Sequence, residues 1–210
     1  MKKVLMLNAS VRNEKSQSRK LSQLFENQWK EKFPDDVFTH REVGTAIIPH
    51  IGEPWIAAAF IKPENRTEEN QKALVLSNKL VDELKENDIY VLATPMYNWS
   101  IPSGLKAYID QIMRINETWK FRSGTPDGDY VGLLTHKKMF LLSSRGDTGY
   151  GKHEKNAHMN FQTTYLSFIF RMMGVTDITV ISLDNEEFGG DLFANSQKQA
   201  FKQVVEVITQ

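Results

Sequence analysis

The stretch VLMLNASVRNEKSQS, residues 4–18, joins a short apolar run to a long polar loop. Val4–Leu7 is continuously apolar, which is typical of a strand buried on both faces of a parallel sheet. From about Ser18 the apolar residues recur at helical spacing as far as Phe33, and Pro34 ends the pattern. The chain therefore begins with a predicted strand, a loop and a helix.

The same unit recurs along the sequence. Further strands are predicted at 37–43, 89–93, 139–142 and 178–181, and further helices begin after Thr67 and near Pro102 and cover about 161–173 and 193–208. Five strands that alternate with five helices predict βαβ units with right-handed crossovers. The expected structure is one α/β domain over residues 1–210, a five-stranded parallel sheet with helices on both faces.

Two insertions interrupt the alternation, at about 44–66 and 117–134. The first has three prolines, no clear period and the apolar patch Trp55–Ile61. A connection of this length is more often functional or interface-forming than idle, and the alternative is a short helix packed on its own domain. The second insertion is rich in aromatic residues, glycine and threonine, and it is predicted to form a loop or hairpin.

Composition excludes several classes of protein. The chain has no cysteine, which excludes disulfides and thiolate chemistry, and its 26 basic residues balance 26 acidic ones, so no nucleic-acid partner is expected. No apolar run approaches the roughly 20 residues that span a membrane, and a cytoplasmic location is expected. No carboxylate lies at metal-ligand spacing from His153 or His158, so no metal site is expected.

The loop Ser10–Ser18 follows the first strand and has no glycine, which argues against a dinucleotide fingerprint and a Walker A motif. It offers three serine hydroxyls at the start of a helix, where backbone N–H groups favour a phosphate. A plain helix cap by Ser16 or Ser18 is the alternative.

Two further loops follow central strands. Thr94–Trp99 is a proline-containing turn whose tyrosine, asparagine and tryptophan suit a flat heteroaromatic ligand, or simply cap the core. Ser144–Gly149 contains Gly146, which permits close approach to a ligand or forms an ordinary turn. Ligands of open parallel sheets bind at the carboxyl ends of the strands, so all three loops are expected to meet there, at the switch point of the common strand order 2-1-3-4-5.

Taken together, these segments resemble the FMN-dependent NADH-azoreductase/NAD(P)H:quinone oxidoreductase family of flavodoxin-like enzymes. The resemblance covers nearly the whole chain, and its motifs are KVLMLNAS (3–10), SQS (16–18), PMYNW (95–99), LKAYID (105–110) and SRG (144–146). It implies a flavodoxin-like three-layer sandwich. Two departures from the family's pattern bear on substrate preference: Asp147, where family members often have a second glycine, and the divergent loop 148–156 that follows it.

The resemblance also implies roles for individual residues. The FMN phosphate is expected at Ser10, Ser16, Gln17 and Ser18; the isoalloxazine at Pro95, Met96, Tyr97, Asn98 and Trp99; and the pyrimidine side of the ring at Ser144, Arg145 and Gly146. No side chain is expected to act as a catalyst, because FMN carries the chemistry. Similar enzymes are homodimers, and the insertion 44–66 with Trp119, Phe121 and Phe161 is expected to close the substrate site.

The implied activity is a ping-pong reaction in which NADH or NADPH reduces FMN, and FMN then reduces a quinone or an azo compound. Two alternatives are a flavodoxin-type electron carrier and an NAD(P)H-dependent FMN reductase. Carriers are typically strongly acidic, and the net charge of zero counts against that reading. A receiver-like signalling domain is disfavoured, because the strand ends lack an acidic cluster.

Overall fold

The computed structural model describes residues 1–122 and 129–209. Its main sheet has five parallel strands in the order β2-β1-β3-β6-β7, which confirms the predicted order 2-1-3-4-5 when only the strands of this sheet are numbered. The strands are β1 (Lys3–Asn8), β2 (Val37–Glu42), β3 (Ile89–Pro95), β6 (Lys138–Ser144) and β7 (Asp177–Leu183).

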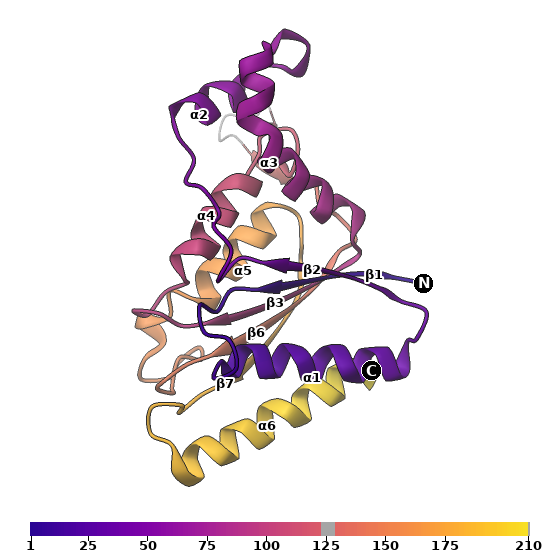
Figure 1. Cartoon of the computed structure of the whole chain (residues 1–210). Coiled ribbons are helices and arrows are strands. Elements are labelled where there is room, and N and C mark those ends of the chain that lie inside the picture. The colour runs from indigo at the N-terminus through magenta and orange to yellow at the C-terminus, as the bar shows by residue number, and fades with distance from the viewer. Residues whose placement is uncertain (123–128, 210) are drawn as a thin grey trace.

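Helices cover both faces of this sheet and complete the three layers (Figure 1). One face carries α1 (Gln17–Lys32) and α6 (Gly190–Thr209), and the other carries α3 (Glu68–Glu86), α4 (Ser103–Ile112) and α5 (Thr163–Met172). Along β1, Leu5 and Leu7 enter the core beneath α3, α4 and α5, whereas Val4 and Met6 enter the core beneath α1 and α6. Burial on both faces explains why the strand is continuously apolar.

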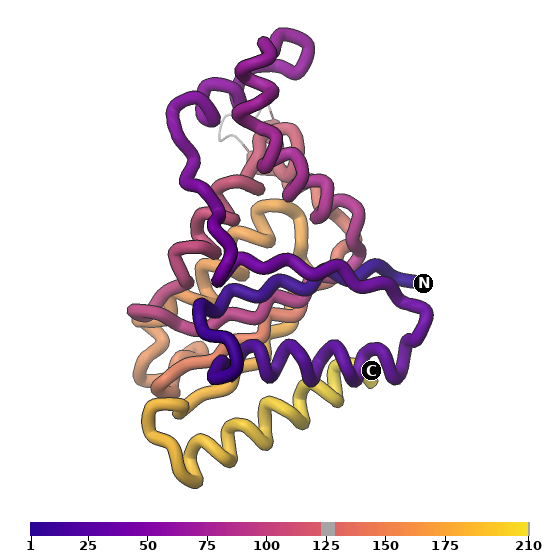
Figure 2. The backbone as a smooth tube through the Cα atoms, viewed as in Figure 1, coloured from indigo at the N-terminus to yellow at the C-terminus, as the bar shows by residue number. Residues whose placement is uncertain are grey.

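The carboxyl ends of β1, β3, β6 and β7 lie at one edge of the sheet, because the strands are parallel. In the trace of Figure 2, the loops that follow these strands gather at this edge. The three polar loops picked out in the sequence are therefore neighbours in space, although more than 130 positions separate Ser10 from Ser144.

The insertion at 44–66 contains a short helix, as one of the two interpretations of this segment predicted. It is α2 (Glu53–Phe60), followed by a 3-10 turn, η1 (Pro63–Asn65). Trp55 and Ala58 of α2 are buried against Leu74 of α3, so the insertion packs on its own domain, as the simpler interpretation of this segment held. The outer side of α2 is not packed in this way. Phe60 is 70% exposed, which leaves an apolar side chain available for contact with another molecule.

The second insertion forms an antiparallel hairpin of β4 (Trp119–Arg122) and β5 (Asp129–Gly132); residues 123–128 of this predicted excursion lie outside the described residues. Its base is fixed to the end of α5 by a close backbone approach. A Cβ atom added to Gly132 would lie 2.1 Å from the nitrogen of Gly174, so only glycine fits there. The hairpin is thus tied to the domain rather than free to swing about its base.

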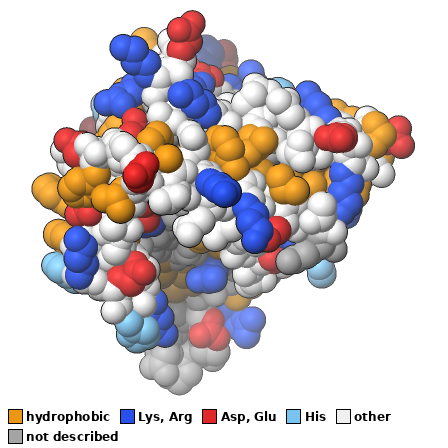
Figure 3. Space-filling model, turned by 90° about the horizontal axis from the view of Figure 1, so that it is seen from below, with side chains coloured by type: hydrophobic (Ala, Val, Ile, Leu, Met, Phe, Trp, Pro, Cys, Tyr) orange, Lys and Arg blue, Asp and Glu red, His pale blue; other side chains and the backbone are white. Residues whose placement is uncertain are grey.

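Charges of both signs are interspersed on the face of the molecule drawn in Figure 3. This surface agrees with a net charge of zero and gives no single-signed field that would steer a polyelectrolyte. In the part of the chain that the structure describes, no helix combines the length and the apolar character needed to cross a membrane.

Candidate functional site

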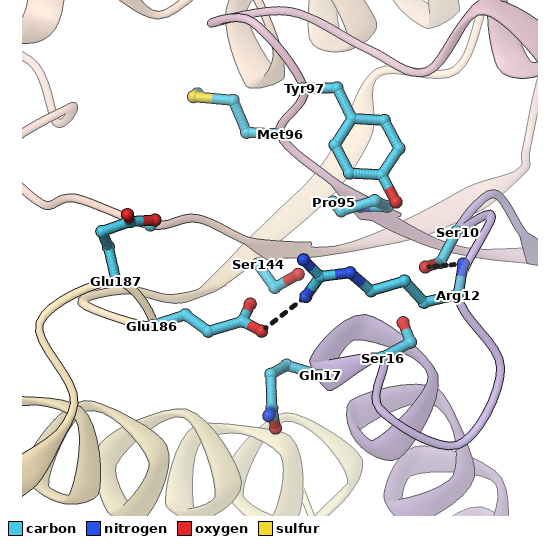
Figure 4. A pocket seen from close by; sticks show the side chains of 11 residues that line it. Ser10, Arg12, Ser16, Gln17, Pro95, Met96, Tyr97, Ser144, Glu186 and Glu187 are labelled. Carbon is cyan, nitrogen blue, oxygen red and sulfur yellow. Dashed lines mark hydrogen bonds and ion pairs between the residues drawn. The ribbon is translucent and has the colours of Figure 1, made fainter.

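A pocket of about 430 Å³ lies at the carboxyl ends of the central strands, within the usual size range of small-molecule sites. The residues that line it come from four segments of the chain: Ser10, Arg12, Ser16 and Gln17; Pro95, Met96 and Tyr97; Ser144 and Gly146; Glu186 and Glu187. Figure 4 shows side chains of all four segments around one hollow. The three loops expected to meet do meet, and a fourth joins them.

The first loop leads directly into α1. Ser16 is the N-cap of this helix, and its Oγ accepts a hydrogen bond from the Arg19 N–H at 3.3 Å. Ser16 therefore caps the helix and also lines the pocket, so the two interpretations of this loop are compatible. Ser18 is fully buried and its Oγ lies 3.1 Å from that of Ser16, which places it behind the pocket wall as a support for Ser16.

Arg19 holds the backbone of this loop in place. Its guanidinium donates to the carbonyl of Ser10 at 2.7 Å, to the carbonyl of Arg12 at 2.8 Å and to both carboxylate oxygens of Glu42. Because Arg19 engages these two carbonyls, they face away from a ligand. The loop is therefore organised before any anion arrives.

Glu42 completes this network from the end of β2. It also accepts the N–H groups of Gly44 at 2.8 Å and Thr45 at 3.0 Å. Burial raises the pKa of Glu42, but the hydrogen bonds from Arg19, Thr45 and Gly44 outweigh it and leave the pKa below its ordinary value. Gly44 packs so closely beneath the loop that an added Cβ would lie 2.2 Å from the Ser10 carbonyl oxygen.

The second loop is a two-residue turn after β3. Tyr97 and Ser100 exchange backbone hydrogen bonds of 3.0 Å, and the two central residues, Asn98 and Trp99, have φ angles of 49° and 62°. Consecutive left-handed residues define a type I′ turn, which suits Asn and is strained for Trp. The turn keeps Trp99 54% exposed at the mouth of the site.

Asn98 and Trp99 do not line the main pocket. They line an adjoining cavity of about 430 Å³ together with Asp147, Tyr150 and Phe188, and the two hollows share Met96, Gly146 and Glu187. The second loop thus contributes Pro95–Tyr97 to one hollow and its aromatic tip to the other. The adjoining cavity is the natural place for a second molecule beside a ligand in the main pocket.

The third loop places only two of its three predicted residues in the pocket. Ser144 and Gly146 line it, but the Arg145 side chain is buried and points elsewhere. Its guanidinium makes two hydrogen bonds to Asp184, of 2.7 Å and 3.0 Å, and lies 4.9 Å from the centre of the Tyr150 ring. Arg145 therefore joins the loops after β6 and β7, and its backbone N–H and carbonyl are also bonded to Leu183 and Glu186, so it supports the pocket without lining it.

Glu186 and Glu187 were not predicted as site residues. They lie after β7, and their N–H groups donate to the carbonyls of Arg145 and Gly146 at 3.2 Å and 3.0 Å. Glu186 also forms an ion pair of 3.2 Å with Arg12 (Figure 4). Ligands of such sheets bind at the carboxyl ends of the strands, and this rule also holds for the fifth strand. Applied to that strand, the rule would have pointed to Glu186 and Glu187.

The aromatic residues expected to close the substrate site do not reach the pocket of their own chain. Trp119 and Phe121 lie on the β4–β5 hairpin and pack against Tyr130, with ring centroids 5.6 Å and 5.4 Å apart. Phe161 precedes α5 and is 60% exposed. Among residues 1–122 and 129–209, no cluster of side chains suited to a metal ion occurs either.

The pocket fits a phosphorylated flavin on observations of the structure itself. The hydroxyl of Tyr97 and the Oε1 atom of Gln17 are buried and have no hydrogen-bond partner among the described residues. Buried polar groups are normally paired, so a bound molecule with hydroxyls and carbonyls would satisfy them. The first turn of α1 adds free N–H groups for a phosphate.

Comparisons with known proteins agree with this assignment. A family model described as a flavodoxin-like fold matches residues 2–208. The chain is 39% identical over 201 residues to FMN-dependent NAD(P)H:quinone oxidoreductase 1 of Pseudomonas aeruginosa, with 95% of each protein covered. It is 37% identical over 208 residues to FMN-dependent NADH:quinone oxidoreductase 1 of Pseudomonas fluorescens, which covers 99% of this chain and 98% of that protein. An azoreductase structure from Bacillus anthracis superposes with a TM-score of 0.88 at 27% identity, covering 99% of both chains.

Replacing Glu42 with Gln should lower the free energy of unfolding at neutral pH, because it weakens the tie to Arg19. A carboxyl group with a lowered pKa stabilises the fold above its ordinary pKa, and this contribution disappears as the pH falls through the lowered value. The difference between wild type and Glu42→Gln in urea unfolding should therefore shrink with acidification. Glu86→Gln, at an exposed position of α3, is the control. A difference that is constant with pH would contradict this role of Glu42.

Replacing Ser16 and Ser18 together with Ala should reduce the FMN retained by the purified protein. The variant loses the side-chain hydroxyl that both caps α1 and lines the pocket, together with its buried support. Flavin absorbance per folded protein is the measurement, since the lost cap alone costs about 1 kcal/mol of stability. Ser22→Ala, one turn further along α1, is the matched control. Unchanged flavin content in the double variant would show that the phosphate assignment is wrong.

Proposed function

Because the chain belongs to the flavodoxin-like family that includes the FMN-dependent NADH:quinone oxidoreductases, we propose that it is itself such an oxidoreductase. It uses NADH or NADPH to reduce quinones by two electrons and to cleave aromatic azo compounds reductively. The observation that carries the proposal is the convergence of the serine loop, the Met96–Tyr97 segment and Gly146 on one pocket. In the proposal, the serine loop holds the phosphate and the other two segments hold the flat ring, so one pocket accommodates both parts of the cofactor.

When bound, FMN would supply the redox chemistry, the transfer of two electrons from a nicotinamide to the acceptor. The chain supplies binding and orientation. Ser10 and Ser16 offer hydroxyls to the phosphate, beside the N–H groups of the first turn of α1. Met96 and Tyr97 form one wall for the ring, and Gly146 lets the backbone approach it from the opposite loop.

The proposed order of reaction is ping-pong, and the adjoining cavity supports it. The adjoining cavity, with Trp99 and Phe188 in its wall, is the space beside the cofactor pocket that a nicotinamide or an acceptor would use. One such space serves both molecules only if the first leaves before the second enters. The exposed indole of Trp99 offers each of them an aromatic face.

The proposal extends to a homodimer. Trp119, Phe121 and Phe161 do not line the pocket of their own chain, and Phe121 and Phe161 are 52% and 60% exposed. A second copy that covers the open side of the site would bury such aromatics and exclude water from the reaction. Light scattering at working concentration should give the mass of two chains, and a monomeric mass would contradict this part of the proposal.

The proposed location is the cytoplasm, and the proposed partners are small molecules: a nicotinamide donor and a quinone or azo acceptor. The absence of cysteine from the sequence is compatible with this location. Balanced charge supports a small-molecule partner over a nucleic acid.

Two alternative functions share the fold and the cofactor. An electron-carrier flavodoxin docks on a protein partner, and an FMN reductase releases its reduced flavin instead of retaining it. The adjoining cavity beside the cofactor pocket favours an enzyme over a carrier, because a carrier needs no space for a second small molecule.

The decisive measurement is turnover. FMN-loaded protein should oxidise NADH or NADPH in the presence of menadione, and it should decolourise methyl red with the same donor. Free FMN at equal concentration is the control that separates catalysis by the protein from reaction of released flavin. Failure of the loaded protein to turn over either acceptor would exclude the enzyme and leave the electron carrier.

A further inference from the structure

Arg12 extends across the pocket from the serine loop toward the segment after β7. Figure 4 shows its side chain reaching from the serine loop to Glu186, with which its guanidinium forms the ion pair of 3.2 Å. The N–H of Arg12 donates to Ser10 Oγ at 3.1 Å, so its backbone is anchored at the predicted phosphate site while its side chain reaches away from it. The Arg12 side chain is 60% exposed and the Glu186 side chain 28% exposed.

The two arginines of this region differ in how freely they can move. Arg19 is held by two backbone carbonyls and a carboxylate, and only 21% of its side chain is exposed. It has little freedom to turn toward a ligand. Among the described residues Arg12 has one charged partner, and a solvent-exposed ion pair of this kind contributes only about 0–1 kcal/mol, so it is easily exchanged.

A phosphate is the stronger partner for Arg12. Guanidinium groups bind phosphate with two parallel hydrogen bonds, and a dianion attracts them more than a carboxylate does. The Arg12 backbone already lies at Ser10, in the wall that Ser16 and Gln17 share. Turning the side chain back over this wall would place its charge against a phosphate bound there and would leave Glu186 without its partner.

We propose that Arg12 exchanges Glu186 for the phosphate of bound FMN and so makes the site selective for phosphorylated flavin over riboflavin. Glu186 competes for Arg12 and thereby weakens cofactor binding. This inference rests on the proposed function, because it assumes FMN in the pocket. It assigns to Arg12 a binding role and to Glu186 an opposing one, and both can be measured without turnover.

The test is a fluorescence-quenching titration of flavin-free protein with FMN and, separately, with riboflavin. Arg12→Ala should weaken FMN binding by about tenfold or more, the usual loss for a charge-assisted hydrogen bond, and should leave riboflavin binding nearly unchanged. Glu186→Gln should tighten FMN binding several-fold, and this gain should vanish in the Arg12→Ala background. Lys15→Ala is the matched control, because Lys15 carries the same charge in the same loop but, unlike Arg12, does not line the main pocket.

Three results would overturn the inference. The first is FMN affinity that Arg12→Ala leaves unchanged or improves, and the second is an equal effect of this variant on FMN and riboflavin. The third is a Glu186→Gln gain that persists without Arg12, which would mean simple repulsion of the phosphate by Glu186. Each of these leaves the proposed function intact, whereas wild-type protein that binds neither flavin would contradict the proposed function itself.

Discussion

The site depends on the hydrogen bonds and the ion pair that the guanidinium of Arg19 makes. A loop that binds an anion must present its N–H groups and turn its carbonyls away, and carbonyls turned away need donors of their own. Arg19 supplies these donors to Ser10 and Arg12 and takes its counter-charge from Glu42. One side chain on α1 therefore joins the end of β1, the start of α1 and the end of β2. The glycine at position 44 is part of the same arrangement, because only its missing side chain lets the β2 end pack this closely beneath the loop.

The sequence was sufficient to predict the sheet because burial on both faces leaves a strong local signal. Val4–Leu7 of β1 and Ile89–Ala93 of β3 are apolar without interruption, and the polar loops after these strands mark where they end. The helix α2 left no such signal: its apolar residues run consecutively from Trp55, so no period was visible. It is defined by a contact distant in sequence, the packing of Trp55 and Ala58 on Leu74, which no local pattern contains.

The residues of the candidate site likewise differ in whether the sequence alone could predict them. Most residues of the three loops were predicted to meet at the strand ends, and Ser10, Ser16, Gln17, Pro95, Met96, Tyr97, Ser144 and Gly146 do line one pocket. Sequence proximity could not separate residues in the wall from those behind it, as Ser18 and Arg145 illustrate. The residue types of Glu186 and Glu187 resemble an ordinary solvated turn, so only their position after the fifth strand could have marked them as residues that complete the pocket.

The turn at Asn98 and Trp99 places stability and ligand contact in opposition at a single position. A tryptophan in the left-handed conformation costs about 1–2 kcal/mol relative to a residue that adopts it freely. Glycine at position 99 would recover that free energy and would remove the indole from the wall of the adjoining cavity. Selection for thermal stability alone would therefore favour glycine at this position. Tryptophan is retained only where the functional advantage of an aromatic surface at the mouth of the site exceeds the loss of stability.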